Sequence, residues 1–422
     1  MKSWHDKYGP VVRTGPNEVS ITDVDAMQAV LGTSGFPKGQ FYDGRWDPKA
    51  PAGSLIILQG EEHTNRRRLW TRGMSPQSLK EYERLIGKRV NLLIEKLEAL
   101  AGIDSSIDLA AWISYFTFDF MGDMMFGGGF ELLRDSGDKN GLLEVMKQFA
   151  IAVQVICHIP WAATVMNKIP VFGRNTKRLR AFGVEAATRR VKMGASSKDL
   201  WYHLTDEAGF EKVRPSLASV VADGALAIVA GADTTVSALS SLFYFLLSNP
   251  NHYKKLQEEV DTVYPPGSDP LDVSKHSELK YMNACINEAL RLQPPVSTNG
   301  PRSSDGRVLA GHFVPPGTQV YVPPYSLHRD PRYFSSPNEF LPERWLDPTT
   351  SNVAAFIPFS YGPANCVGKV LARQEMFMVT STLLQKFYFS FAKGFRLESW
   401  PENLRDHFVT TRGPLLVNIR TR

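Results

Sequence analysis

A single cysteine lies where a loop rich in glycine and proline enters a helix-forming sequence. Cys366 belongs to the loop that runs from Phe359 to Lys369. A thiol at the start of a helix faces free backbone N–H groups and the positive end of the helix dipole, which lower its pKa. Gly362 and Gly368 carry no side chain, so a flat ligand could approach the backbone closely. We therefore predict a ligand-binding thiolate at Cys366, although most lone cysteines are simply small buried apolar residues.

Two polar residues lie inside an unusually apolar run. The segment from about Ser216 to Ser248 is apolar on nearly all sides, which predicts a long helix through the centre of the fold. Asp233 and Thr234 within it are costly to bury unless they are hydrogen-bonded. A threonine can bond to the carbonyl one turn back. Alternatively, the helix opens at Gly231 and both side chains line a cavity that holds water.

Basic and acidic residues at helical spacing form two further candidates. His63 and Arg67 are four residues apart and share one helix face. Other arginines of this run, such as Arg66, are expected either on a solvated face or against an acidic partner. Glu288 and Arg291 are three apart and also share a face, but an exposed pair of this kind contributes only about 0–1 kcal/mol.

These residues, in this order, resemble the cytochrome P-450 family, and the details look most like its fungal microsomal members. The Cys366 loop is similar to the haem-binding loop of that family. The resemblance implies that Cys366 is the axial thiolate ligand of haem b iron. It also implies that Asp233 and Thr234 relay protons to dioxygen over the haem.

The resemblance assigns further roles by position. The cofactor contacts that it implies are His63, Arg67 and Arg302 for the haem propionates, with Phe359, Gly362 and Gly368 beside the ring. Glu288, Arg291 and Arg344 match a structural triad that locks the segment before the cysteine loop. Position 364 is Ala where many members carry a basic propionate-binding residue, which shifts weight to Arg67 and Arg302. Residues expected to line the substrate pocket are Ala227, Ala230, Thr235, Val296 and Val409.

The implied activity is monooxygenation. One oxygen atom of dioxygen enters a hydrophobic small molecule by hydroxylation or epoxidation, in secondary metabolism or xenobiotic oxidation. Electrons come from NADPH through NADPH-cytochrome P-450 reductase, with cytochrome b5 as a further partner, on a basic face near Lys369, Arg373 and Arg66. Two alternatives stay open: a haem-thiolate isomerase or dehydratase, which needs no acid–alcohol pair, and a haem-binding sensor or carrier without catalysis.

The elements that position these residues indicate a mainly α fold with small β-sheets. We expect residues 1–422 to form a single catalytic domain of the cytochrome P-450 fold. Its β-rich parts are predicted at roughly 8–22, 300–325 and 387–420. Predicted helices cover about 61–72, 79–101, 109–125, most of 139–213, and then 216–248, 253–263 and 279–292.

Bulk properties narrow the remaining possibilities. A net charge of +5 over 422 residues is too weak to indicate nucleic-acid binding. Three cysteines without a C-x-x-C pair predict neither a disulfide framework nor a structural zinc site. The family expectation is the cytosolic face of the endoplasmic reticulum membrane. The chain as given has no apolar N-terminal segment, so we expect it to be soluble or peripherally attached, either shortened or naturally without an anchor.

Overall fold

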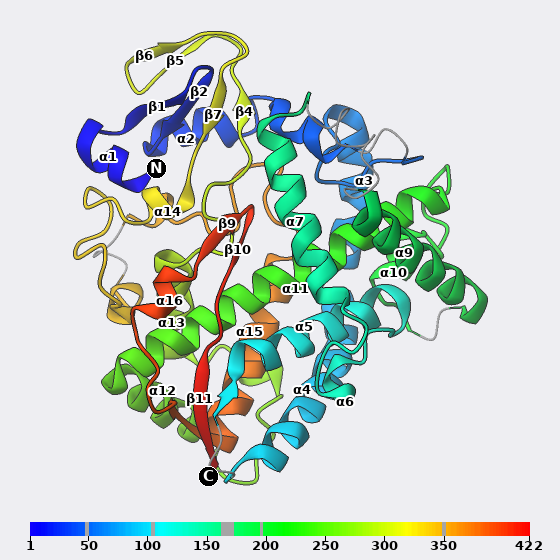
Figure 1. The fold of residues 1–422 in the computed structure, drawn as a ribbon, viewed down its shortest axis with the longest axis vertical. Coiled ribbons are helices and arrows are strands. Elements are labelled where there is room, and N and C mark those ends of the chain that lie inside the picture. The colour runs from blue at the N-terminus through cyan, green and yellow to red at the C-terminus, as the bar shows by residue number, and fades with distance from the viewer. Residues whose placement is uncertain (47–49, 103–105, 162–172, 195–196, 348–351) are drawn as a thin grey trace.

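The computed structural model describes residues 1–46, 50–102, 106–161, 173–194, 197–347 and 352–422. The predicted central helix is α11, Leu217–Ser248, which crosses the middle of the molecule (Figure 1). Ser216 caps it by accepting a hydrogen bond from the Ser219 N–H. Among the described helices, α11 is the one long and apolar enough to cross a membrane. However, 67% of its most apolar window is buried in the protein, as expected for a core helix.

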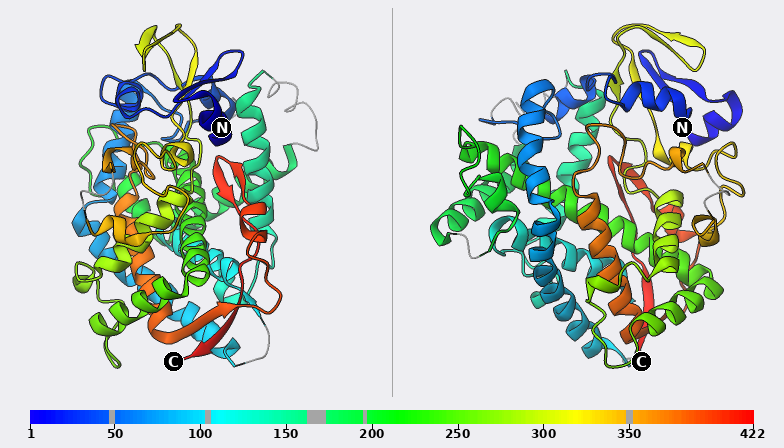
Figure 2. Two further views of the ribbon diagram at one scale, coloured as in Figure 1. Left: turned by 90° about the vertical axis from the view of Figure 1, so that its left-hand side faces the viewer. Right: turned by 180° about the vertical axis from the view of Figure 1, so that it is seen from behind.

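Long helices surround α11 and form the main core with it. The most extensive contact of α11 is with α5, Leu109–Phe126. This helix is buried over most of its length. Seen from behind, α15 (orange) runs beside α4 in the lower half of the molecule (Figure 2). The bounds of these packed helices are α3 Gly60–Gly73, α4 Pro76–Leu100, α12 Pro250–Val263, α13 Lys280–Leu292 and α15 Lys369–Lys386.

A small sheet joins the two halves of the sequence. Its strand order is β1-β2-β7-β4, with β1 Val11–Gly15, β2 Glu18–Ile21, β7 Gln319–Tyr321 and β4 Arg302–Ser303. The N-terminal hairpin is antiparallel, whereas β2 pairs with β7 in parallel. This pairing brings Arg302 close to the N-terminal part of the chain.

The C-terminal strands return along the helical body. β11, Leu416–Thr421, pairs with β3, Ile107–Asp108, and with β8, Phe387–Phe391. A separate hairpin of β9, Arg405–His407, and β10, Val409–Thr411, lies against α11. A fourth small sheet pairs β5, Arg307–Leu309, with β6, His312–Val314.

The prediction of a mainly α fold with small sheets is confirmed. The N-terminal helix α1, Lys2–Tyr8, was not predicted, because its seven mostly polar residues give no periodic apolar signal. Part of the helical prediction for 139–213 lies outside the described residues. The remaining elements are α2 Val24–Leu31, η1 Gln40–Arg45, α6 Leu132–Asp135, α7 Leu142–His158, α9 Gly173–Met193, α10 Leu200–Leu204, η2 Val273–Lys275, α14 Pro324–Leu327, η3 Pro342–Trp345, η4 Val353–Ala355 and α16 Ser399–Glu402.

Candidate active site

Cys366 lies two residues before the cap of α15, Gly368, and its side chain is exposed. Its backbone N–H donates to the Phe359 carbonyl at 2.9 Å, which closes the loop on itself. The expectation of a lowered thiol pKa is wrong for the free side chain. The surrounding protein raises the pKa of Cys366, and this effect outweighs the Gly368 N–H and the charges of Arg67 and Lys369, which lower it.

Neighbouring segments hold the cysteine loop in place. Arg67 on α3 donates through Nη1 to the Asn365 carbonyl at 2.6 Å and through Nη2 to Asn365 Oδ1 at 2.8 Å. Gly362 has a left-handed φ of 73°, and a Cβ there would lie 1.9 Å from the carbonyl oxygen of Leu31. The loop is therefore fixed between α3 and the end of α2, directly before Cys366.

Four basic side chains gather beside this loop: Lys38, His63, Arg67 and Arg302. Burial, followed by the charges of Lys38, Arg67 and Arg302, lowers the pKa of His63 to about 4. Burial, followed by Arg302 and Arg67, lowers the pKa of Lys38 to about 7. Among the described residues, no carboxylate acts on the pKa of Lys38, His63 or Arg67, so the cluster favours an anionic ligand.

Lys38 is the member of this cluster that sequence reasoning missed. Its segment pairs with the strand that carries Arg302, through Ser303 N–H to the Pro37 carbonyl at 2.9 Å and Gly39 N–H to the Pro301 carbonyl at 3.2 Å. The Lys38 ammonium donates to the Leu58 carbonyl at 2.7 Å. A lone lysine in a Gly- and Pro-rich loop gives no local signal, because this long-range pairing places it.

The central helix carries Asp233 and Thr234 without a break. α11 is continuous, and Thr234 Oγ1 donates to the Ala230 carbonyl at 2.6 Å, so the ordinary hydrogen bond of a helical threonine is present. Gly231 serves helix packing instead of a helix opening: a Cβ there would lie 2.6 Å from Met121 Sδ on α5. Burial raises the pKa of Asp233 to about 6, and the nearby charge of Arg412 acts in the opposite direction.

The residues predicted to line a pocket separate into two groups. Ala227 and Thr235 are each only 2% exposed and pack within the core, whereas Ala230 is exposed one helical turn before Thr234. The burial of Ala227 and Thr235 argues against them as pocket contacts. Val296 and Val409 are half-buried on neighbouring segments, which the Thr410 N–H joins by donating to the Pro295 carbonyl at 2.8 Å. Ala230, Val296 and Val409 are thus accessible in this structure, whereas Ala227 and Thr235 are not, and their role as substrate contacts stays a prediction.

Glu288, Arg291 and Arg344 lie in direct contact in the core. Glu288 accepts from Arg291 Nε at 2.8 Å and from Arg344 Nε at 3.0 Å. It also accepts from the Leu341 N–H at 2.9 Å and from Trp345 Nε1 at 2.9 Å. Arg291 donates to backbone carbonyls of the segment 328–339. These bonds tie α13 to the segment that leads into the cysteine loop.

The α3 arginines are paired within the protein. Arg66 donates to the buried Asp223 carboxylate on α11 at 3.0 Å. Arg68 and Arg72 both pair with Glu211. Their counter-ions thus come from distant parts of the same chain, and the expected contact with an acidic partner stays a prediction.

The basic face expected near Cys366 therefore has fewer free charges than predicted. Arg373 donates to Asn283 Oδ1 at 3.1 Å and to Asn287 Oδ1 at 2.6 Å. Lys369 is exposed at the start of α15. Of the three basic residues expected there, Lys369 is the one without such an internal contact among the described residues.

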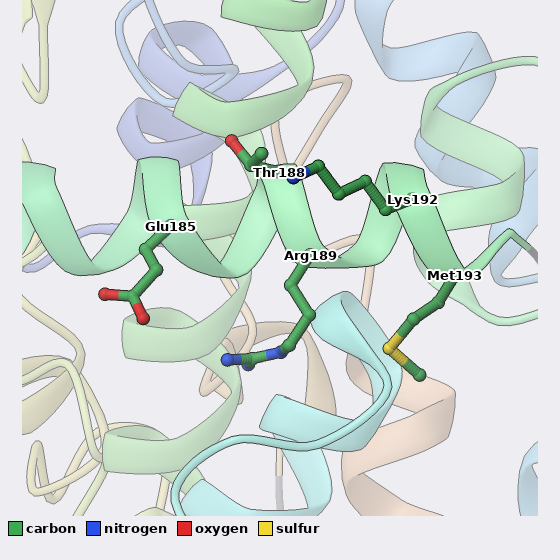
Figure 3. Close-up of a pocket in the computed structure, with 5 residues that line it drawn as sticks. All are labelled: Glu185, Thr188, Arg189, Lys192 and Met193. Carbon is green, nitrogen blue, oxygen red and sulfur yellow. The ribbon is translucent and has the colours of Figure 1, made fainter.

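A hollow of about 410 Å³ lies elsewhere, along α9 (Figure 3). It is open to solvent and lined by Glu185, Thr188, Arg189, Lys192 and Met193, all from this one helix. None of the predicted site residues contributes to it. We therefore place the candidate active site at the Cys366 loop and not at this hollow.

Comparison with known proteins decides the family. A family model described as cytochrome P450 matches residues 1–419. The chain belongs to the cytochrome P450 family. Cytochrome P450 67 of Uromyces fabae is 33% identical over 429 residues, covering 97% of this chain and 78% of that protein. Cytochrome P450 monooxygenase cpaH of Aspergillus oryzae is 34% identical, covering 98% and 82%, and the trichothecene C-15 hydroxylase of Fusarium sporotrichioides is 33% identical, covering 99% and 87%.

Membership in the cytochrome P450 family fixes the class of chemistry. The protein is an oxidoreductase that incorporates oxygen, and its family uses haem and dioxygen. Family members also work with a redox partner and act on hydrophobic substrates. The resemblance to fungal members is confirmed by the relatives described above.

Proposed function

We propose that this protein is a haem-thiolate monooxygenase that inserts one oxygen atom into a hydrophobic secondary metabolite, by hydroxylation or epoxidation. Residues 1–422 act as one catalytic domain. The similarity to a trichothecene C-15 hydroxylase supports hydroxylation. Electrons come from NADPH through NADPH-cytochrome P-450 reductase, with cytochrome b5 as a second donor.

The observation that carries this proposal is the cation cluster beside an exposed thiol. Arg302 Nε is buried and has no hydrogen-bond partner among the described residues. Its neighbours Lys38 and His63 are also basic. A buried donor without an acceptor is costly, so a ligand with carboxylates at this point would satisfy it. The two propionates of haem b supply such carboxylates.

The glycines of the loop fit the same ligand. A Cβ at Gly368 would meet no atom within 4 Å, so the protein itself leaves the space next to this residue open. A flat macrocycle held over Cys366 requires such a clear approach. Cys366, with Phe359, Gly362 and Gly368, would hold the haem, and Lys38, His63, Arg67 and Arg302 would bind its propionates. When bound, the haem supplies the activation of dioxygen.

The residues of α11 serve the delivery of protons. Asp233, with its pKa of about 6, holds or releases a proton near neutral pH. Thr234 keeps its hydroxyl next to the Ala230 carbonyl and can pass a proton along this face of the helix.

The structure leaves fewer free basic residues for a redox partner than the sequence predicted. Lys369 is the proposed contact for the reductase, since Arg66 and Arg373 already have partners inside the protein. We also propose that residues 1–422 associate peripherally with the cytosolic face of the endoplasmic reticulum membrane.

One spectrum tests the proposal. Reduced protein with carbon monoxide should absorb at the position typical of thiolate ligation, and Cys366→Ser should lose that band. A band typical of histidine ligation, or none, would contradict the proposal. Incorporation of ¹⁸O from ¹⁸O₂ into a product then separates a monooxygenase from an isomerase or a carrier. Spin-state titration with hydrophobic compounds identifies candidate substrates for this assay.

A further inference from the structure

The short helix η1 ends in an arginine that lies over two aromatic rings. Arg45 Cζ is 4.1 Å from the centroid of the Phe408 ring and 5.4 Å from the centroid of the Phe41 ring. The two rings are 6.0 Å apart, with an interplanar angle of 25°. Phe41 lies on η1 and Phe408 at the tip of the β9–β10 hairpin. The guanidinium of Arg45 therefore makes a cation–π contact with two segments that are distant in the sequence.

The C-terminal end of α7 is the third part of this junction. The Phe41 ring meets the His158 ring edge-on, with 5.4 Å between the centroids. A Cβ at Gly44 would lie 2.6 Å from Cys157 Cα, so η1 packs directly against α7. The tip of the β9–β10 hairpin lies beside α7 in both Figure 1 and Figure 2. Arg45 is thus held where three segments meet.

The guanidinium of Arg45 nevertheless lacks an acceptor. Its Nε is buried and has no hydrogen-bond partner among the described residues. The described groups whose charge acts on the pKa of Arg45 are Cys157 and Tyr42, and neither is a carboxylate. A buried cationic donor without an acceptor is costly to the protein.

Arg307 shows the usual arrangement of an arginine on an aromatic ring. Its Cζ lies 4.7 Å from the centroid of the Phe36 ring, and its guanidinium also forms an ion pair with Asp305. Arg45 has the ring contacts without the carboxylate. The missing group is therefore an anionic acceptor, which a bound ligand could supply.

The junction adjoins both parts of the candidate active site. Phe408 directly precedes Val409, which is accessible and is one of the predicted substrate contacts. Tyr42 packs on the segment that leads to Arg302, since a Cβ at Gly300 would lie 2.1 Å from Tyr42 Oη. Tyr42 thus links Arg45 to the cation cluster, and Phe408 links it to the predicted substrate pocket.

The backbone of Phe408 is held in an uncommon conformation. Its φ is 75°, in the left-handed region that bulky residues seldom adopt. The Phe408 N–H donates to Asp406 Oδ1 at 2.9 Å, which fixes the tip of the hairpin. Such strain persists only where the surrounding structure determines it, and it clusters at sites that bind ligands. Here it keeps the Phe408 ring against the Arg45 guanidinium.

We propose that Arg45 is a specificity-determining residue that binds a carboxylate of the substrate, so that the substrate is a hydrophobic molecule with an acidic group. The inference rests on the proposed function, because it names the class of substrate for that monooxygenase. The carboxylate accepts charge-assisted hydrogen bonds from the guanidinium N–H groups. The rings of Phe41 and Phe408, with Val409, contact the apolar part of the molecule next to it.

Matched acid and ester probes test this class of substrate. Dodecanoic acid, 2-naphthoic acid and abietic acid are each compared with their own methyl ester near neutral pH, where a carboxyl group with a pKa of about 4 is ionised. Spin-state titration of the holoenzyme measures binding, and isothermal titration calorimetry repeats the comparison without the haem spectrum. We expect at least one acid to bind about 10- to 100-fold more tightly than its ester, the range of a charge-assisted hydrogen bond. If no acid binds more tightly than its ester, the inference is overturned.

Variants of Arg45 then assign the preference to this residue. Arg45→Gln should reduce the acid-to-ester ratio to about 1 and leave the affinity for the ester unchanged. Arg45→Lys keeps the charge and should retain most of the ratio. Arg307→Gln is the matched control, because it removes another ring-stacked arginine that already has its carboxylate, and it should keep the wild-type ratio. All variants are compared as holoenzymes with matched carbon monoxide spectra.

Two results with the variants would also overturn the inference. One is an acid-to-ester ratio in Arg45→Gln equal to that of the wild type. The other is an equal loss of affinity for acid and ester, which would show that Arg45 only maintains the packing of the junction. Failure of the proposed function is a different outcome, since it appears as a missing thiolate-type band or as no incorporation of ¹⁸O, whatever the acid-to-ester ratio.

Discussion

The two glycines beside Cys366 differ in what the protein requires of them. Gly362 has a φ of 73°, and a Cβ there would collide with the Leu31 backbone. Gly368 has an ordinary φ of −86°, and a Cβ there would enter open space. The fold requires the first glycine, whereas no described neighbour would meet a side chain at the second.

This difference predicts opposite behaviour of two alanine variants. Gly362→Ala should destabilise the protein by at least about 2 kcal/mol, because it combines a left-handed residue with a backbone clash. Gly368→Ala should change the unfolding free energy by less than about 0.5 kcal/mol but lower haem retention. Urea unfolding and haem content, measured on both variants, check this. Full haem retention in Gly368→Ala would show that this residue does not adjoin the cofactor.

Single residues also show where sequence reasoning reaches its limit. Cys366, Asp233 and the Glu288 group could be located because each lies in a recognisable local pattern. Lys38 could not, since a strand pairing with residues more than 260 positions away along the chain places it. The predicted direction of the Cys366 pKa shift was wrong. Opposing effects act on this pKa, and their balance depends on neighbours that are distant in the sequence.

At the scale of elements, one buried carboxylate holds α13 against the segment before the cysteine loop. Glu288 and Arg291 are fully buried, and Arg344 is 3% exposed. Glu288→Gln would leave two buried guanidinium groups without their counter-ion, at a cost of about 3–5 kcal/mol. Urea unfolding of the variant against wild type measures this cost.

The matched control is Glu343, the acidic residue next to Arg344. Glu343 pairs with Lys255, and these side chains are 47% and 51% exposed. An exposed pair contributes little, so Glu343→Gln should cost less than about 1 kcal/mol. Equal losses in both glutamine variants would show that the Glu288 contacts have no special stabilising role.

The close approach of α5 and α11 depends on a glycine. Gly231→Ala would press its Cβ against Met121 Sδ, at 2.6 Å, and should destabilise by about 1–3 kcal/mol. Met121→Ala creates space at this point, so the double variant should lose less than the sum of the two single variants. Thermal unfolding of all three gives the coupling. Additive losses would mean that Gly231 is needed for a reason other than this contact.

Elements were predicted well where the apolar period was long. The continuous apolar surface of 216–248 predicted the start of α11 to within one residue and its end at the correct residue. The ion pairs between elements could not be predicted, because Arg66 meets an aspartate 157 residues away. A charged run alone does not show whether its counter-ions lie in solvent, in a partner or in the same chain.

At the scale of the whole molecule, this internal pairing changes how the net charge of +5 is distributed. Arg66, Arg68 and Arg72 are neutralised by Asp223, Asp206 and Glu211. Lys369 stays exposed beside the cysteine loop. The attraction of an acidic reductase should therefore depend on Lys369 far more than on the α3 arginines.

Reversing the charge of Lys369 tests this distribution. Lys369→Glu should slow reduction by the reductase roughly tenfold at low salt, because electrostatic steering governs such encounters. The difference should shrink as salt rises, since the screening length falls to about 8 Å at 0.15 M. Lys192→Glu on α9 makes the same charge change at the hollow of Figure 3 and should leave the rate unaltered.

Arg66→Gln should instead lower stability, because it leaves the buried Asp223 carboxylate without its cation. Stopped-flow reduction over a range of salt concentrations separates these effects, and equal slowing in both glutamate variants would place the reductase contact elsewhere.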